Sequence, residues 1–281
     1  MDKLNALVNL TRINKPIGIF LLLWPTLSAL WLASDGIPNI RILFIFILGI
    51  ILMRSAGCVA NDLADRNFDS FVQRTRNRPI TSGLVSPQEA IILLLLLLIL
   101  SFLLVLQLNF TTILISFFAL LFSITYPFSK RFFNLPQLFL GVTFGFSILM
   151  AFTAVQNKIP LEAIILFITN IFWTFSYDSH YAITDIEDDK KLNIHSAPLT
   201  FNKKIILMIT LSYFLMFLSL FIIAVLREFT LSFYLFLGLA IIISVYGCFE
   251  SRHMDPSKNF KAFLRNNYVG FFIFAGFFIQ I

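Results

Sequence analysis

The sequence predicts an all-α integral membrane protein, a bundle of nine transmembrane helices with its N-terminus in the cytoplasm. Composition, the spacing of apolar runs and the distribution of Lys and Arg predict this fold class. Of the 281 residues, 58% are hydrophobic and 13% are charged, whereas a soluble globular protein has about 25% charged residues. The composition therefore excludes an ordinary soluble domain.

The apolar runs predict the transmembrane spans. A helix needs about 20 mostly apolar residues to cross a hydrocarbon core of about 30 Å. Nine such runs are expected at residues 16–33, 40–60, 89–108, 110–128, 136–155, 160–177, 205–226, 231–249 and 263–281. Because no soluble domain interrupts them, we expect one domain over residues 1–281.

Local signals mark where two helices begin. Ser86 and Glu89 form a predicted capping box, and Pro87 occupies the first position of the third spanning helix. Asp255 and Pro256 are expected to cap a short helix before the last span. The first apolar run is too long for a typical signal peptide and lacks an A-x-A cleavage site, so we expect it to remain as the first helix.

The basic residues orient the bundle, because short cytoplasmic loops carry an excess of Lys and Arg. Under the nine-helix interpretation, only Arg41, Lys158 and Arg227 lie on the side opposite to the other basic loop residues. This places the N-terminus in the cytoplasm and the C-terminus outside. The net charge of +6 is then explained by topology and by anionic membrane lipid, so no nucleic-acid partner is expected.

Two acidic segments dominate the polar part of the chain. Eight of the 15 acidic residues lie within residues 61–69 and 178–189, on the predicted cytoplasmic side. Acidic residues at helix ends are commonly solvated loop charges, but this density and spacing argue against that interpretation. Carboxylates near hydrocarbon are costly and repel one another, so a counter-cation is expected to keep them ionised.

The spacing within each segment indicates a ligand face. On a helix, Asn61, Asp65 and Asp69 recur every fourth residue and share a face, with Asp62 on its flank. The second segment repeats this pattern, with Tyr181 one turn and Asp178 two turns before the pair Asp185 and Asp189. Oxygen ligands without His or Cys favour Mg²⁺, and two such faces opposed across a cavity would bind a diphosphate. The expected metal ligands are Asn61, Asp62, Asp65, Asp69, Asp185, Asp188 and Asp189, and the expected catalytic residues are Asp65, Asp69, Asp185 and Asp189.

Residues 61–69 also match the pattern NDxxDxxxD, and here the chain resembles the UbiA superfamily of intramembrane prenyltransferases. The resemblance is to its 4-hydroxybenzoate polyprenyltransferase branch and covers nearly the whole chain. It also rests on residues 18–26, on M-R-S-A-G-C at 53–58, on Arg74 and Arg78-Pro79, on Y-P-F at 126–128 with Lys130-Arg131, and on Tyr177-Asp178 with Tyr181.

The resemblance implies a nine-helix bundle around a central cavity that opens laterally to lipid for an isoprenoid tail. It implies polyprenyl diphosphate and 4-hydroxybenzoate as substrates, Mg²⁺ as cofactor and 3-polyprenyl-4-hydroxybenzoate, a ubiquinone precursor, as product. It places the protein in the bacterial inner membrane, with the active site facing the cytoplasm and no obligate protein partner. Other acceptors, such as haem, homogentisate or a naphthoate, and a cation-coupled secondary transporter remain alternatives. The expected substrate-binding residues are Arg54, Arg78, Tyr126, Lys130, Asp178 and Tyr181.

Arg54 has two possible roles. It lies seven residues before Asn61, about two helical turns deeper on a similar face, where a buried guanidinium without a partner would be costly. It is expected either to recognise an anion, which is the diphosphate or an aromatic carboxylate, or to be a structural partner of one of the aspartates. Arg78 and Lys130 are expected to hold the leaving diphosphate.

Overall fold

The computed structural model describes residues 3–66, 75–192 and 194–280. All of its regular secondary structure in these ranges is helical. The helices are α1 (Lys3–Thr11), α2 (Ile17–Ser34), α3 (Ile40–Asp65), α4 (Pro87–Val105), α5 (Phe110–Ser129), α6 (Pro136–Gln156), α7 (Leu161–Ile183), α8 (Ile186–Lys191), α9 (Ala197–Phe201), the short 3₁₀ helix η2 (Asn202–Lys204), α10 (Ile205–Leu226), α11 (Leu231–Glu250) and α12 (Pro256–Phe278).

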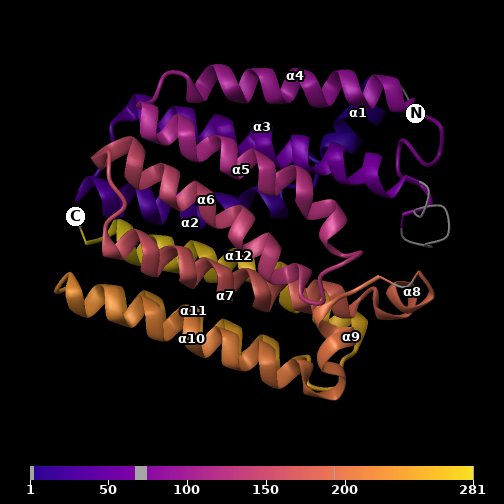
Figure 1. Cartoon of the computed structure of the whole chain (residues 1–281). Helices are drawn as coiled ribbons and strands as arrows, with labels where there is room; N and C mark the ends of the chain where they lie inside the picture. Colours follow the sequence, from indigo (N-terminus) through magenta and orange to yellow (C-terminus); the bar gives the residue numbers. More distant parts are fainter. Residues whose placement is uncertain (1–2, 67–74, 193, 281) are drawn as a thin grey trace.

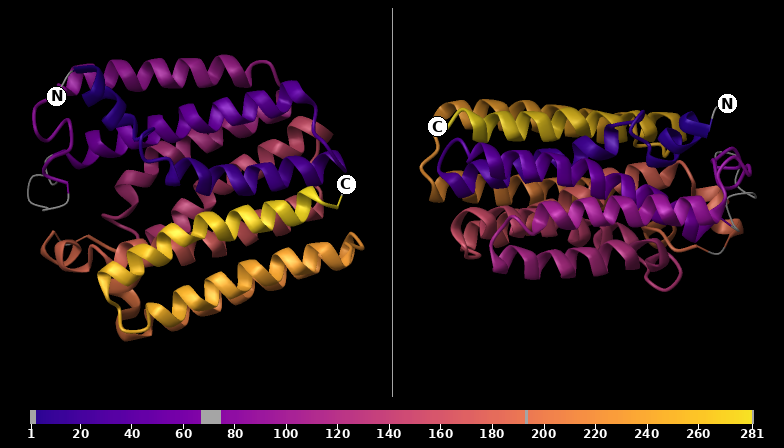
Figure 2. Two further views of the ribbon diagram at one scale, coloured as in Figure 1. Left: turned by 180° about the vertical axis from the view of Figure 1, so that it is seen from behind. Right: turned by 90° about the horizontal axis from the view of Figure 1, so that it is seen from above.

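The long helices run side by side, as Figures 1 and 2 show. The most extensive packing joins α11 to α12, α6 to α7, α7 to α10, α5 to α6, and α3 to α4. The short helices α1, α8 and α9 gather at one end of the bundle, and the C-terminus lies at the other end (Figure 1). The described residues of both acidic segments therefore lie at the end that carries the short helices.

Seven helices in the described ranges are long and apolar enough to cross a membrane. They are α2, α3, α4, α5, α6, the continuous stretch Ala197–Leu226 that contains α10, and α11. The remaining two long helices, α7 and α12, have 23 residues each but carry more polar side chains. The all-helical membrane fold is thus confirmed, while the count of nine spans stays a prediction.

The predicted helix starts are partly confirmed. The Ser86 hydroxyl accepts a hydrogen bond from the Glu89 amide, and the Glu89 carboxylate accepts one from the Ser86 amide, which completes the capping box. Asp255 also caps a helix, because its carboxylate accepts from the Lys258 amide at 3.0 Å. The expected separate short helix is wrong, since α12 continues without a break from Pro256 to Phe278.

The polar residues of α12 explain this continuity, because several of them are buried and hydrogen-bonded inside the bundle. Asn266 is 2% exposed, and its side-chain oxygen accepts hydrogen bonds from Trp173 Nε1 and from the Tyr213 hydroxyl, both at 2.9 Å. Its amide nitrogen donates to the Ala262 carbonyl. Asn266 therefore joins α12 to α7 and α10.

Asn266→Ala is expected to destabilise the bundle by about 2–5 kcal/mol, because two buried donors lose their acceptor and each costs about 1–3 kcal/mol. Reversible unfolding in detergent would measure this loss. Lys261→Ala, at an exposed position of the same helix, is the matched control and should change stability by less than about 0.5 kcal/mol. Equal stabilities of the two variants would show that the Asn266 bonds contribute nothing.

Candidate functional site

A cavity of about 880 Å³ opens among α2, α3, α4, α5, α6 and α7. Its wall is charged at the end that carries the acidic segments, where Asp62, Asp178 and Asp185 line it together with Arg12 and Lys130. Its other part is apolar and lies between α3, α4 and α5. A cavity of this size matches a ligand site that takes an elongated molecule with one polar end.

Residues 61–65 of the first acidic segment form the last turn of α3. This helix has 26 residues, more than the roughly 20 needed for one span, so its final turns extend to the charged end of the cavity. Asn61 Nδ2 donates to Asp65 Oδ2 at 3.4 Å, as expected for residues one turn apart. Asn61 and Asp62 line the cavity. Asp65 does not line it, but its carboxylate pairs with Lys130, which does. Asp69, also an expected ligand, lies outside the described residues.

The second acidic segment does not form one continuous helix. α7 ends at Ile183, and Asp185 precedes the separate short helix α8. The Asp189 amide nevertheless donates to the Asp185 carbonyl at 2.8 Å, so these two residues remain one turn apart, and both line the cavity. Asp188 lies outside the cavity lining and pairs with Lys191 at 3.5 Å. The break re-aims Asp185 and Asp189 relative to Asp178 on α7.

Lys130, at the end of α5, connects the two acidic segments. Its ammonium group donates to Asp65 Oδ2 at 2.9 Å. The charges of Lys130, Arg54 and Asp185 all act on Asp178, which lines the cavity from α7. Tyr126 and Tyr181 line the same wall. The structure therefore brings together the expected residues of α3, α5 and α7.

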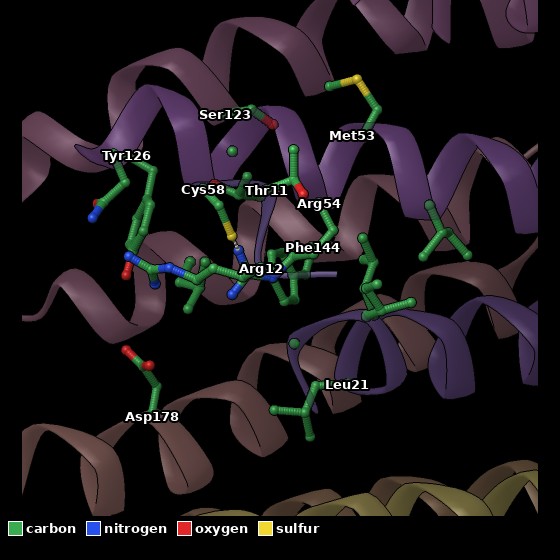
Figure 3. A pocket seen from close by; sticks show the side chains of 18 of the residues that line it. Thr11, Arg12, Leu21, Met53, Arg54, Cys58, Ser123, Tyr126, Phe144 and Asp178 are labelled. Atoms are coloured by element: carbon green, nitrogen blue, oxygen red, sulfur yellow. Dashed lines mark hydrogen bonds between the residues drawn. The ribbon is translucent and has the colours of Figure 1, made fainter. Parts of the chain in front are cut away.

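Arg54 reaches the cavity from the middle of α3. Its Nη1 donates to Cys58 Sγ at 2.9 Å, and its buried Nε has no hydrogen-bond partner. A thiol is a weak acceptor. Figure 3 shows Arg54 and Cys58 joined in this way, with Arg12, Tyr126 and Asp178 extending into the same space. The Arg54 guanidinium is therefore a positive group at the cavity wall with an unused donor on Nε and only a weak acceptor on Nη1.

Two cavity residues were missed by the sequence reasoning. Cys58 lines the cavity beside Arg54, although nothing in its spacing distinguishes it from a packing residue. Arg12 lies just after α1 and pairs with Asp62 at 2.6 Å, fifty residues away in sequence. The apolar residues of the short N-terminal helix before Arg12 show no clear helical periodicity. Only the short distance in sequence between Arg12 and the first span could have indicated that Arg12 belongs to the site.

The charged groups of the site are largely neutralised by one another. Asp62 pairs with Arg12 and Arg78, and Asp65 pairs with Lys130. Among the residues that the structure describes, no three His, Cys, Asp or Glu side chains are placed to hold a metal ion. The carboxylate and amide oxygens of Asn61, Asp65, Asp185 and Asp189 are nevertheless the donor types that Mg²⁺ prefers.

Comparison with known proteins shows what the chain is similar to. The model of the UbiA prenyltransferase family matches residues 22–275. A 4-hydroxybenzoate octaprenyltransferase of Methylobacillus flagellatus is 46% identical over 275 residues, which cover 98% of this chain and 93% of that protein. The enzyme of the same name from Psychromonas ingrahamii is 48% identical over 282 residues, with 99% and 97% covered.

Solved structures share the fold. A UbiA homolog from Aeropyrum pernix K1 superposes with a TM-score of 0.82 at 22% identity, covering 93% of this chain and 97% of that chain. A UbiA homolog from Archaeoglobus fulgidus bound to GPP and Mg²⁺ gives a TM-score of 0.74 at 16% identity, covering 98% and 99%. At these identities the likeness concerns the fold alone.

Proposed function

The chain belongs to the UbiA prenyltransferase family, and from this premise we propose that it transfers a polyprenyl group from polyprenyl diphosphate to 4-hydroxybenzoate. The product is 3-polyprenyl-4-hydroxybenzoate, a precursor of ubiquinone. The observation that carries the proposal is that one cavity of about 880 Å³ joins residues of both acidic segments and several cations to a long apolar region. This arrangement suits a donor with an anionic head and an isoprenoid tail.

The membrane arrangement follows the same proposal. Nine helices span the bacterial inner membrane, with the N-terminus and the acidic segments on the cytoplasmic side. The polar residues of α7 and α12 are compatible with spanning, because Trp173 and Asn266 bond to each other within the bundle. The grouping of α1, α8 and α9 at one end and of the C-terminus at the other supports this topology (Figure 1).

The apolar part of the cavity receives the isoprenoid tail. Leu98 and Phe102 of α4 line it on one side, and Phe117 and Leu120 of α5 line it on the other. Phe102 and Phe117 are 43% and 52% exposed, so the cavity reaches side chains that face lipid. A tail of any length can therefore continue into the membrane, because the apolar isoprenoid is not exposed to water there.

The charged end of the cavity receives the diphosphate. The proposed Mg²⁺ ligands are Asn61, Asp65, Asp185 and Asp189, with Asp69 added from sequence spacing alone. Mg²⁺ bound there would supply a Lewis acid that draws charge from the diphosphate. Asp188, which pairs with Lys191 away from the cavity wall, is left out of this set.

The protein's own groups carry the remaining chemistry. Lys130 and Arg78 hold the diphosphate as the allylic carbon–oxygen bond breaks and its electron pair passes to the leaving group. The ring carbon ortho to the hydroxyl of 4-hydroxybenzoate then bonds to the allylic carbon, and Asp185 accepts the ring proton. The apolar cavity excludes water, which would otherwise capture the allylic cation.

The acceptor is oriented by Arg54. Its guanidinium faces the cavity near Tyr126 and Asp178, deeper than the acidic ends of α3. A benzoate carboxylate supplies two oxygens that match the guanidinium fork. We assign the aromatic carboxylate rather than the diphosphate to Arg54, because Lys130 and Arg78 already lie at the diphosphate end.

The activity is tested with membranes that contain the protein, labelled 4-hydroxybenzoate, a polyprenyl diphosphate and Mg²⁺. We expect a lipid-soluble labelled acid whose formation stops when EDTA removes the metal. Homogentisate and a naphthoate serve as competing acceptors in parallel reactions. Absence of a prenylated acid, or a preference for another acceptor, would contradict the proposal.

Gly18→Ala is expected to raise the KM for 4-hydroxybenzoate by roughly tenfold, the loss of about one charge-assisted hydrogen bond. A Cβ at Gly18 would lie 2.5 Å from Arg54 Nε, so the guanidinium has to move. Steady-state kinetics measures the change. Gly238→Ala, where an added Cβ meets nothing within 4 Å, is the control. An unchanged KM for the acceptor would show that the position of Arg54 does not govern acceptor binding.

A further inference from the structure

The turn between α11 and α12 carries a basic surface on the outside of the bundle. It lies at the end that carries the short helices, as the two figures of the whole chain show (Figures 1 and 2). Its charged side chains do not line the substrate cavity. We call it the α11–α12 basic surface, and its cationic side chains are Arg252, Lys258, Lys261 and Arg265.

The three cations of α12 share one face of that helix. Lys258, Lys261 and Arg265 follow one another at spacings of three and four residues, which places them side by side. Arg265 also lies against α11, because its Nη1 donates to Glu250 and its Cζ is 4.7 Å from the centre of the Tyr246 ring. The charges of Lys258 and Lys261 act on Glu250 as well. The basic face of α12 therefore borders the last turns of α11.

Arg252 extends this surface from the turn. Its Cζ lies 4.2 Å from the centre of the Phe249 ring, and its Nε donates to His253 Nε2 at 3.0 Å. A guanidinium held over an aromatic ring keeps its N–H groups at the edge of its plane, where they can donate to phosphate oxygens. Residues 246–268 have four cationic side chains against the carboxylates of Glu250 and Asp255, so they carry an excess of two positive charges with His253 neutral.

Large rings lie under and beside these cations. Tyr246, Phe249 and Tyr268 are 52%, 62% and 57% exposed, on helices that run through the bundle from end to end. Exposed aromatic side chains at the ends of spanning helices are typical of the membrane–water interface. A free anion would contact the cations alone. An anionic phospholipid would bring its phosphate to the cations and its acyl chains to the rings.

We propose that the α11–α12 basic surface binds an anionic phospholipid, with the phosphate held by Arg252 and by the basic face of α12. The acyl chains then lie along the exposed rings of α11 and α12. The choice of the cytoplasmic leaflet rests on the proposed topology, whereas the binding itself goes beyond the proposed reaction. Phe260 and Phe263 of the same turns of α12 line the substrate cavity, so the lipid packs against a helix that forms part of the cavity wall.

The proposal is tested by lipid binding to the full-length protein in neutral detergent. Equal amounts of phosphatidylglycerol and phosphatidylcholine with the same acyl chains are added, and native mass spectrometry counts the lipids that the protein retains. We expect the wild-type protein to retain phosphatidylglycerol about tenfold over phosphatidylcholine, because choline adds a positive charge beside the cations. Arg252→Gln with Arg265→Gln should abolish most of this preference.

Controls separate a built site from general surface charge. Lys190→Gln with Lys191→Gln removes the same charge from exposed positions of α8, at the same end of the bundle, and should change the lipid ratio by less than twofold. Phe249→Leu keeps an apolar side chain but removes the ring under Arg252, so it should give an intermediate loss. Arg252→Gln alone, at an exposed position of the turn, keeps the test informative if the double variant fails to fold.

Three results would overturn the proposal. An unchanged lipid ratio in Arg252→Gln with Arg265→Gln would show that this surface binds no lipid. An equal loss in the α8 control would show that the ratio follows net charge alone. If inorganic phosphate raised the thermal unfolding midpoint of the wild-type protein as much as phosphatidylglycerol does, the ligand would be a free anion. Full prenyl transfer without a lipid preference would contradict only this inference, and a lipid preference without prenyl transfer would contradict only the proposed function.

Discussion

Asp185→Asn is expected to lower kcat for prenyl transfer by about 10²–10³-fold, the cost of removing one preorganised group that stabilises developing charge. Asp185 lines the cavity, precedes α8 and acts electrostatically on Asp178. The amide keeps the size of the side chain but loses its negative charge, so both the proposed metal site and the proposed base are impaired. Single-turnover product formation at saturating substrates would measure the effect.

Glu187→Gln is the matched control for this variant. Glu187 lies on α8, two residues from Asp185, but its side chain is exposed and it does not line the cavity. Its neutralisation should change kcat by less than twofold. If Asp185→Asn turned over as fast as Glu187→Gln in a correctly folded protein, the second acidic segment would have no part in the reaction.

Arg54→Gln is expected to raise the KM for 4-hydroxybenzoate by roughly 10–100-fold, as for a lost charge-assisted hydrogen bond worth about 1.5–3 kcal/mol. The Nε of Arg54 is buried without a partner, and its Nη1 has only a thiol as acceptor. A carboxylate in the cavity would supply the strong acceptor that the Nε group lacks. Initial rates over a range of acceptor concentrations, with the donor saturating, would measure the change.

Arg41→Gln is the control, because Arg41 lies at the opposite end of the same helix and contacts Gln107 at 3.2 Å. It should leave both KM values unchanged. A rise in the KM for polyprenyl diphosphate alone in Arg54→Gln would assign Arg54 to the diphosphate. Unchanged KM values for both substrates in Arg54→Gln would show that Arg54 binds neither substrate and has only a structural role.

Much of the fold could be predicted because the length of each apolar run matches the thickness of the bilayer that a helix has to cross. Each apolar run that was expected to span corresponds to a long helix, although α7 and α12 are more polar than the other seven and are not among the helices identified as apolar enough to cross a membrane. Their polar residues face one another, as Asn266 and Trp173 do, and sequence does not reveal such pairing. The helix start at Pro256 was predicted, but its continuation into the last span was missed for this reason, since buried asparagines resemble those of a loop.

The site could be predicted less completely than the fold. Helical spacing brings Asn61 next to Asp65, as expected. The same reasoning fails at Thr184, between α7 and α8, because no Gly or Pro marks that break. It also cannot find the contact of Arg12 with Asp62, which depends on how α1 packs against α3. Contacts of long sequence separation leave no periodic signal.

The central claim is that the two acidic segments hold one metal–diphosphate group between them across the cavity. The most direct test is a structure of the protein with Mn²⁺ and a non-hydrolysable polyprenyl diphosphate analogue, in which anomalous scattering locates the metal. We expect metal ligands from both Asn61 or Asp65 on α3 and Asp185 or Asp189 beside α8, with Lys130 on the diphosphate. Metal bound by one segment only, or a diphosphate outside this cavity, would contradict the claim.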